Sequence, residues 1–150
     1  MLRLLIIFAL LVPFKVFASN AVGVIVGDPS GLSARFALDN EHSIDGALAY
    51  ATGANSGFHI HGTYLWDRAR TFPTDQDPIE MYYGLGARII SIDKGKYDGD
   101  VSFGPRAPIG LLYNFTNPNL EVFGEIAAVL DLTPKMTVDL DVGVGVRVRF

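Results

Sequence analysis

The sequence predicts an all-β fold in which eight antiparallel strands, joined in up-and-down order, close into a barrel. Three observations lead to this prediction. Apolar and polar residues alternate along most segments after residue 18, short runs rich in Gly, Pro, Asn and Asp separate these segments, and no helical period persists. Because successive side chains of a strand point to opposite faces, each strand has one apolar face and one polar or small face.

The eight segments follow each other without a linker or a second domain. They are residues 21–27, 32–38, 43–52, 57–67, 79–92, 101–115, 120–132 and 136–150. Turn sequences such as "DNEH", "TNPN" and "TPK" lie between them, and the longest connection is "RARTFPTDQDP". Pro105 and Pro108 lack the N–H groups of a sheet ladder, so we expect the strand over 101–115 to bulge or end near them.

The last segment, "DLDVGVGVRVRF", shows the alternation most clearly. Its even-numbered residues are all apolar, from Leu140 to Phe150, and its odd-numbered residues are Asp, Gly or Arg. In "GFHIHGTYLWD" the same parity separates Phe58 and Ile60 from His59 and His61.

Alternation alone permits two barrels, a soluble one with its apolar face inside and a membrane one with that face toward lipid. The polar face carries many Gly and Ala residues between isolated charges, which suits the narrow interior of an eight-stranded barrel. Aromatic residues near strand ends on the apolar face are typical of interfacial girdles; these are Trp66, Tyr83, Tyr113, Phe115 and Phe150. The sequence therefore favours an eight-stranded antiparallel up-and-down transmembrane β-barrel.

The energetics of charge favour the same arrangement. An Arg that faces lipid near the middle of a bilayer costs about 2–4 kcal/mol, so Arg88 and Arg147 must face the lumen. Charges inside need partners of opposite sign. The predicted lumen charge network, which would hold the barrel rigid, consists of Arg35, Asp45, Arg88, Arg106, Glu121, Glu125, Asp139, Asp141, Arg147 and Arg149.

Residues 1–18 have the pattern of a secretory signal peptide, with Arg3 before an apolar run and "VFA" before a cleavage site after Ala18. Pro13 and Lys15 make the pattern irregular, and an uncleaved anchor is the alternative. The predicted barrel domain is then 19–150, with 10 basic and 16 acidic side chains and a net charge of −6. No basic patch interleaved with aromatic residues is visible, which argues against nucleic acid as a partner. The chain has no cysteine, which excludes disulfides and thiol chemistry.

With these features the sequence resembles the small eight-stranded bacterial outer-membrane barrels typified by the OmpA transmembrane domain and OmpX. "VGVGVRVRF" carries the resemblance most specifically, and implies that Val146, Val148 and Phe150 form the signal read by the barrel assembly machinery. "GDPSGLSARF", "YYGLGARI" and "VLDLTP" also resemble an uncharacterised family of small barrel proteins. With both termini periplasmic, the longest connection would lie in the periplasm, which argues against adhesion by long outer loops.

Two kinds of chemistry remain as alternatives. His59 and His61 could chelate a metal if a third ligand such as Asp45 or Asp67 joined them, although we expect them only to fill the lumen. An outer-membrane lipid-modifying hydrolase would need His59 or His42 beside a Ser on the lipid-facing surface.

We therefore expect an integral protein of the bacterial outer membrane with a structural or interaction role, no enzymatic activity, no cofactor and no metal. Its partners would be outer-membrane lipids and the barrel assembly machinery, and the protein would be a monomer. Two other functions are the alternatives. One is the lipid-modifying hydrolase, and the other is a soluble periplasmic lipocalin-like carrier, which would contain an apolar cavity.

Overall fold

The computed structural model describes residues 19–53, 55–72, 74–75 and 77–150. The predicted signal peptide, residues 1–18, lies outside the described residues. In the part of the chain that is described, no helix is both long and apolar enough to cross a membrane.

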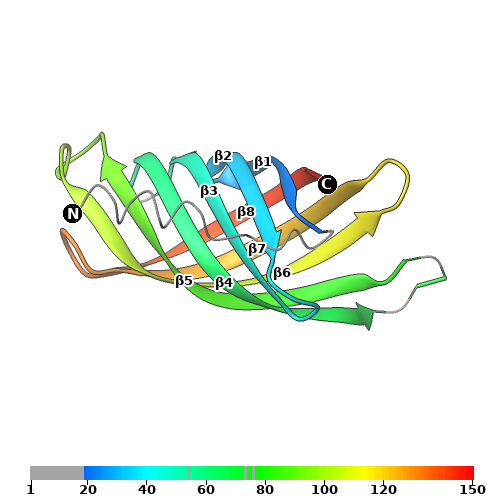
Figure 1. Cartoon of the computed structure of the whole chain (residues 1–150). Coiled ribbons are helices and arrows are strands. Elements are labelled where there is room, and N and C mark those ends of the chain that lie inside the picture. Colours follow the sequence, from blue (N-terminus) through cyan, green and yellow to red (C-terminus); the bar gives the residue numbers. More distant parts are fainter. Residues whose placement is uncertain (1–18, 54, 73, 76) are drawn as a thin grey trace, which may run out of the picture.

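Eight strands form one closed antiparallel barrel in chain order, which confirms the predicted all-β, up-and-down fold (Figure 1). The strands are β1 (Ala21–Asp28), β2 (Ser30–Ala37), β3 (His42–Ala51), β4 (Gly57–Phe72), β5 (Ile79–Ile92), β6 (Val101–Phe115), β7 (Leu120–Asp131) and β8 (Thr137–Arg149). Closure comes from β1, where Ala21 lies opposite Arg35 of β2 on one side and Arg149 of β8 on the other.

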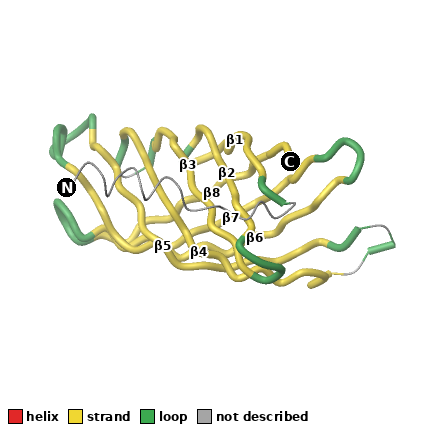
Figure 2. Tube along the Cα trace, viewed as in Figure 1, coloured by secondary structure: helices red, strands yellow, loops and turns green. Residues whose placement is uncertain are grey.

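Turns and loops lie at the two ends of the barrel (Figure 2). We call the end that holds Asn20 and Phe150 the terminal end; there the Phe150 N–H donates to the Asn20 carbonyl at 2.9 Å. At the opposite end the β5–β6 connection turns through Gly95 and Gly99, whose φ angles of 84° and 88° favour glycine.

At the terminal end, β4 and β5 project beyond β3 (Figure 1). The pairing of β3 with β4 stops at His42 and Trp66, whereas β4 continues to Phe72 and pairs there with Ile79 of β5 across a register irregularity. The predicted strand ended at residue 67, because the sequence alternation fades there; backbone pairing with β5 extends it.

The expectation that Pro105 and Pro108 interrupt their strand is wrong. β6 runs through both, with Pro105 opposite Ala87 and Pro108 opposite Ala127. In an antiparallel ladder only every second residue hydrogen-bonds to a given neighbour, so a proline removes a ladder bond while its flanking pairs keep the register.

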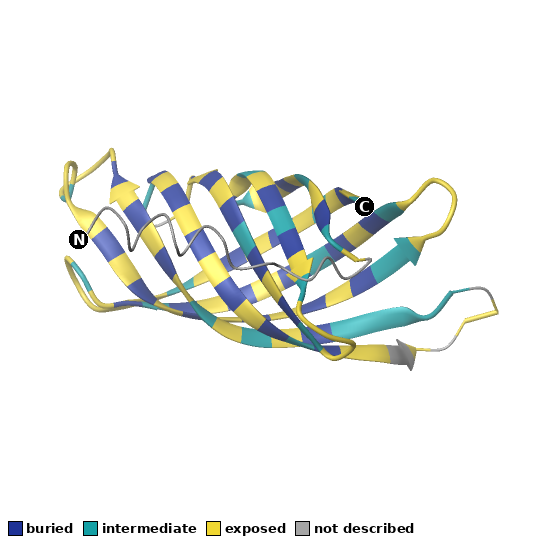
Figure 3. Ribbon diagram, in the orientation of Figure 1, coloured by how far each residue is buried: buried dark blue, intermediate teal, exposed yellow. Residues whose placement is uncertain are grey.

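Burial alternates along the strands with the period of the sequence pattern (Figure 3). Large apolar side chains lie on the outer surface, and Leu32 and Val144 are 61% and 63% exposed. Charged side chains lie inside, where Arg88, Arg106 and Glu121 are each 1% exposed. The distribution of polarity is therefore the reverse of that in an ordinary water-soluble protein, with apolar side chains outside and charged side chains inside.

The interior also contains large apolar side chains, and several of them lie opposite a glycine on the neighbouring strand. Tyr82 pairs with Gly110, Phe123 with Gly145, and Leu65 with Gly84. The missing side chain of each glycine leaves the space that its large partner fills. This arrangement explains why Gly recurs on the inner face beside these large side chains.

Candidate functional site: the charged lumen

Four buried arginines organise the interior of the barrel into two groups of ion pairs. We call them the Arg88–Arg106 cluster, toward the opposite end, and the Arg35–Arg147 cluster, toward the terminal end. Together they contain seven carboxyl groups. These are Asp45, Asp67, Glu121, Glu125, Asp131, Asp139 and Asp141.

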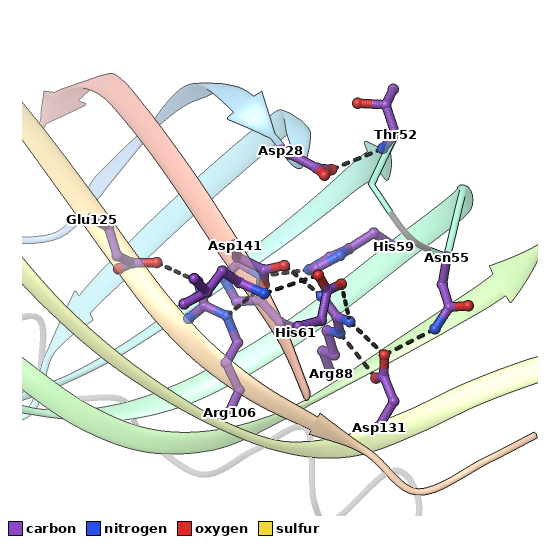
Figure 4. Close-up of polar contacts among 12 residues, drawn as sticks. Asp28, Thr52, Asn55, His59, His61, Arg88, Arg106, Glu125, Asp131 and Asp141 are labelled. Atoms are coloured by element: carbon purple, nitrogen blue, oxygen red, sulfur yellow. Dashed lines mark hydrogen bonds and ion pairs between the residues drawn. The ribbon is translucent and has the colours of Figure 1, made fainter. Parts of the chain in front are cut away.

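In the first cluster, Asp141 of β8 lies between Arg88 of β5 and Arg106 of β6 (Figure 4). One Asp141 oxygen accepts from Arg88 Nη1, and the other accepts from Arg106 Nε at 3.1 Å. Arg88 Nη2 also lies 2.7 Å from both Asp131 and Asp139. Each nitrogen of Arg88 therefore donates to a carboxylate, a condition under which a charge can be buried.

Arg106 extends this cluster across the barrel. Its Nη2 pairs with Glu125 of β7, and its Nη1 donates to the Thr63 hydroxyl of β4 at 3.3 Å. The Tyr82 hydroxyl donates to the other oxygen of Glu125 at 2.9 Å. Strands on different sides of the barrel are thus joined through one guanidinium.

The second cluster is built around Glu121 of β7, whose two oxygens accept from two different arginines. Arg147 Nη1 lies 2.6 Å from one oxygen and Arg35 Nη1 lies 2.9 Å from the other. Arg35 also pairs with Asp67 at 2.7 Å, and Arg147 lies 3.6 Å from Asp45.

Hydroxyl groups and one ring complete the surroundings of these two arginines. Ser43 accepts from Arg35 Nε at 3.0 Å, and Ser33 accepts from Arg147 Nη2 at 2.7 Å. The Arg147 guanidinium also lies 3.8 Å from the centre of the Phe123 ring, within the range of a cation–π contact. Every guanidinium nitrogen of the four buried arginines therefore lies against a carboxylate or hydroxyl oxygen.

Of the ten residues of the predicted charge network, the structure places nine in these two clusters, and Arg149 lies apart. Its Nη2 donates to the Phe115 carbonyl at 2.5 Å, and it has no ion pair with another described residue. The sequence interpretation omitted Asp67 and Asp131. Both lie on the polar face, but near strand ends, where parity alone did not indicate whether they pointed into the barrel or into solvent.

His59 and His61 lie inside the barrel and contact each other. The nitrogens His59 Nε2 and His61 Nδ1 are 2.8 Å apart. In residues 19–53, 55–72, 74–75 and 77–150, no group of three His, Cys, Asp or Glu side chains is placed to hold a metal ion.

His42, the third histidine, lies in a turn at the terminal end, where its Nδ1 is 2.8 Å from Asp39. Neighbouring Ser43 points into the barrel and accepts from Arg35. No hydrogen bond joins a serine to a histidine among the described residues, so the pair that a lipid hydrolase would require is not formed there.

No family model matches the chain, and no curated protein matches it. The structure is similar to the N-terminal β-barrel domain of Pseudomonas aeruginosa OprF, with a TM-score of 0.67 at 16% sequence identity. The match covers 89% of this chain and 98% of that domain. This similarity shows the fold: a closed eight-stranded barrel of the kind that the OmpA-like resemblance implied.

Proposed function

We propose that this protein is an integral β-barrel of the bacterial outer membrane, with a structural or interaction role and no catalytic activity. The observation that carries the proposal is the inverted distribution of polarity. Ionised side chains such as Arg88 and Glu121 are 1% exposed, while Leu32, Val144 and Leu85 are more than half exposed on the outer surface. An apolar outer surface that surrounds the barrel in this way is favourable in lipid and costly in water.

The aromatic residues of the outer surface support the same environment. Trp66 stacks on Tyr83 with ring centres 5.7 Å apart, and Tyr64 meets Trp66 edge to face, all near the terminal end. Phe58, on the same face of β4, lies toward the opposite end. Eight residue steps separate Phe58 from Trp66, which corresponds to about 26 Å along a strand. With a tilt of about 40°, the apolar band is roughly 20 Å tall, close to the ~25 Å band of outer-membrane barrels.

The contents of the barrel interior support a structural role and argue against a role as a carrier of an apolar ligand. A lipocalin-like protein would offer an apolar cavity to its ligand, whereas the interior here is filled by ion pairs and by apolar side chains opposite glycines. With its termini in the periplasm, the protein would present the β4–β5 projection to that compartment. The partners we propose are outer-membrane lipids and, through Val146, Val148 and Phe150, the barrel assembly machinery. Each of these three side chains faces outward.

The test is cell fractionation followed by electrophoresis of unboiled and boiled samples in SDS. A protein that resists carbonate extraction, is found in the outer-membrane fraction and migrates differently after boiling would support a closed barrel in lipid. A protein that carbonate releases into the soluble fraction, with no shift on boiling, would overturn the proposal. A periplasmic marker protein in the same fractions serves as the control for leakage.

A further inference from the structure

A polar cavity of about 250 Å³ opens at the terminal end of the lumen. Side chains from β2, β4, β5, β6, β7 and β8 line it, together with the segment that precedes β1. The lining residues that matter to the argument are Ser19, Arg35, Asp67, Glu80, Asn114 and Arg149.

The two arginines of this cavity differ in their partners, because Arg35 forms ion pairs whereas Arg149 forms none with a described residue and its buried Nε has no hydrogen-bond partner there. Arg35 pairs with Asp67 at 2.7 Å and with Glu121 at 2.9 Å. Arg149 is held by the Phe115 carbonyl, which accepts from its Nη2.

The acceptors of the cavity are less well satisfied. Glu80 is half-buried and lies within hydrogen-bonding range of the Asn114 side chain, and it forms no ion pair with another described residue. The Oδ1 atom of Asn114 is buried and accepts no hydrogen bond from any described group. A half-buried carboxylate beside an unpartnered amide oxygen is the environment that a small cation with several N–H donors would complete, and a primary ammonium has three such donors.

The chain itself supplies such a group at this place. The sequence predicts cleavage after Ala18, which is the residue before Ser19, and Ser19 lines the cavity. A signal peptidase would hydrolyse the Ala18–Ser19 peptide bond with one water molecule, which leaves a carboxylate on Ala18 and an ammonium on Ser19. An unperturbed α-amino group has a pKa of about 7.7–8.0, so this group is mostly protonated at pH 7.

We propose that the α-ammonium of Ser19, once released by processing, binds Glu80 in this cavity and closes the periplasmic mouth of the lumen. The inference rests on the proposed function, because processing requires export. Before cleavage, the same nitrogen is a neutral amide and cannot form the ion pair. The ion pair at the terminal end of the barrel therefore forms only after the signal peptide has been removed.

The test measures the reactivity of the N-terminal amine in the processed protein, folded in detergent. Intact mass first establishes whether the mature chain begins at Ser19. The rate of α-amine modification by a slow acylating reagent near pH 7 is then compared between the wild type and Glu80→Gln. Loss of the carboxylate should speed the reaction about threefold or more, which corresponds to a fall of half a pKa unit in the amine.

Two further variants make the comparison specific. Glu41→Gln removes an exposed carboxylate at the same end that does not line the cavity, and it should leave the rate unchanged. Asn114→Asp adds a carboxylate where the unpartnered amide oxygen lies, and it should slow the reaction. A heat-shifted band from each variant shows that it is folded.

The outcomes separate this inference from the proposed function. A mature chain that begins elsewhere, or equal rates in wild type and Glu80→Gln, would overturn the ammonium site while the barrel remains in the outer membrane. A protein that is absent from the outer membrane would overturn the proposed function itself, and with it the inference.

Discussion

Glu121 and Arg147 lie directly opposite each other on β7 and β8, and their side chains meet inside the barrel at 2.6 Å. The second oxygen of Glu121 reaches Arg35, which is 86 residues away in the sequence. One carboxylate therefore compensates two buried arginines from strands on either side of the barrel closure. A substitution of Glu121 therefore tests how much the buried ion pairs contribute to the stability of the barrel.

Glu121→Gln should lower the free energy of unfolding by about 3–5 kcal/mol, the usual effect of removing one partner of a buried ion pair. The amide has nearly the shape of the carboxylate but cannot compensate both guanidinium groups. Urea unfolding of the refolded barrel in detergent or lipid measures the change. Glu41→Gln, at an exposed turn, is the control and should differ from the wild type by less than about 0.5 kcal/mol.

Val144→Arg should destabilise the barrel by about 2–4 kcal/mol in a bilayer, because Val144 lies near the middle of β8 and its side chain faces outward. Val138→Arg places the same charge on the same face near the end of β8, where the cost in an outer-membrane barrel falls to about 0–1 kcal/mol. Unfolding in lipid vesicles compares the two variants. Equal costs at both positions would argue against a bilayer around this surface.

Gly145→Ala should cost about 1–3 kcal/mol through overpacking. A Cβ atom there would meet the Phe123 ring and would lie 2.5 Å from the backbone oxygen of Val24, which cannot move aside without disturbing β1. Gly62→Ala is the matched control, since nothing lies within 4 Å of the corresponding Cβ position on the outer surface. We expect that variant to unfold at the same urea concentration as the wild type or slightly above it.

Asp39, in the turn between β2 and β3, should have a pKa below its ordinary value of 3.8. The main cause is the hydrogen bond that its carboxylate accepts from the Glu41 N–H at 2.8 Å, and a contact with His42 adds to it. Because the folded state lowers this pKa, the stabilisation is complete above pH 3.8 and is lost as the pH falls through the folded value.

Titration of the Asp39 carboxyl carbon by NMR measures this pKa directly. Asp39→Asn keeps an acceptor for the Glu41 N–H but removes the charge. The difference in stability between the wild type and this variant should therefore shrink as the pH falls below 4. A difference that is constant between pH 6 and pH 2 would contradict the assignment.

The sequence predicted the strands well where alternation and turn residues agree. The segment over 79–92 and the segment over 101–115 have the same ends in the structure. It failed at β4, which continues to Phe72, and at Pro105, which does not end β6. Both differences have one physical origin. How far a strand extends depends on the length and position of the neighbouring strand with which its backbone pairs. The side-chain pattern of a single strand does not indicate either.

The alternation of residues, with the turn sequences between the segments, thus determined by itself the eight strands and which face of each strand is apolar. That information is local, since side chains two positions apart share a face of a strand. Only the tertiary structure decided which charges meet. The approach of Arg35 to Glu121, and of Arg88 and Arg106 to Asp141, follows from register and closure, which bring distant strands to the same depth in one narrow lumen.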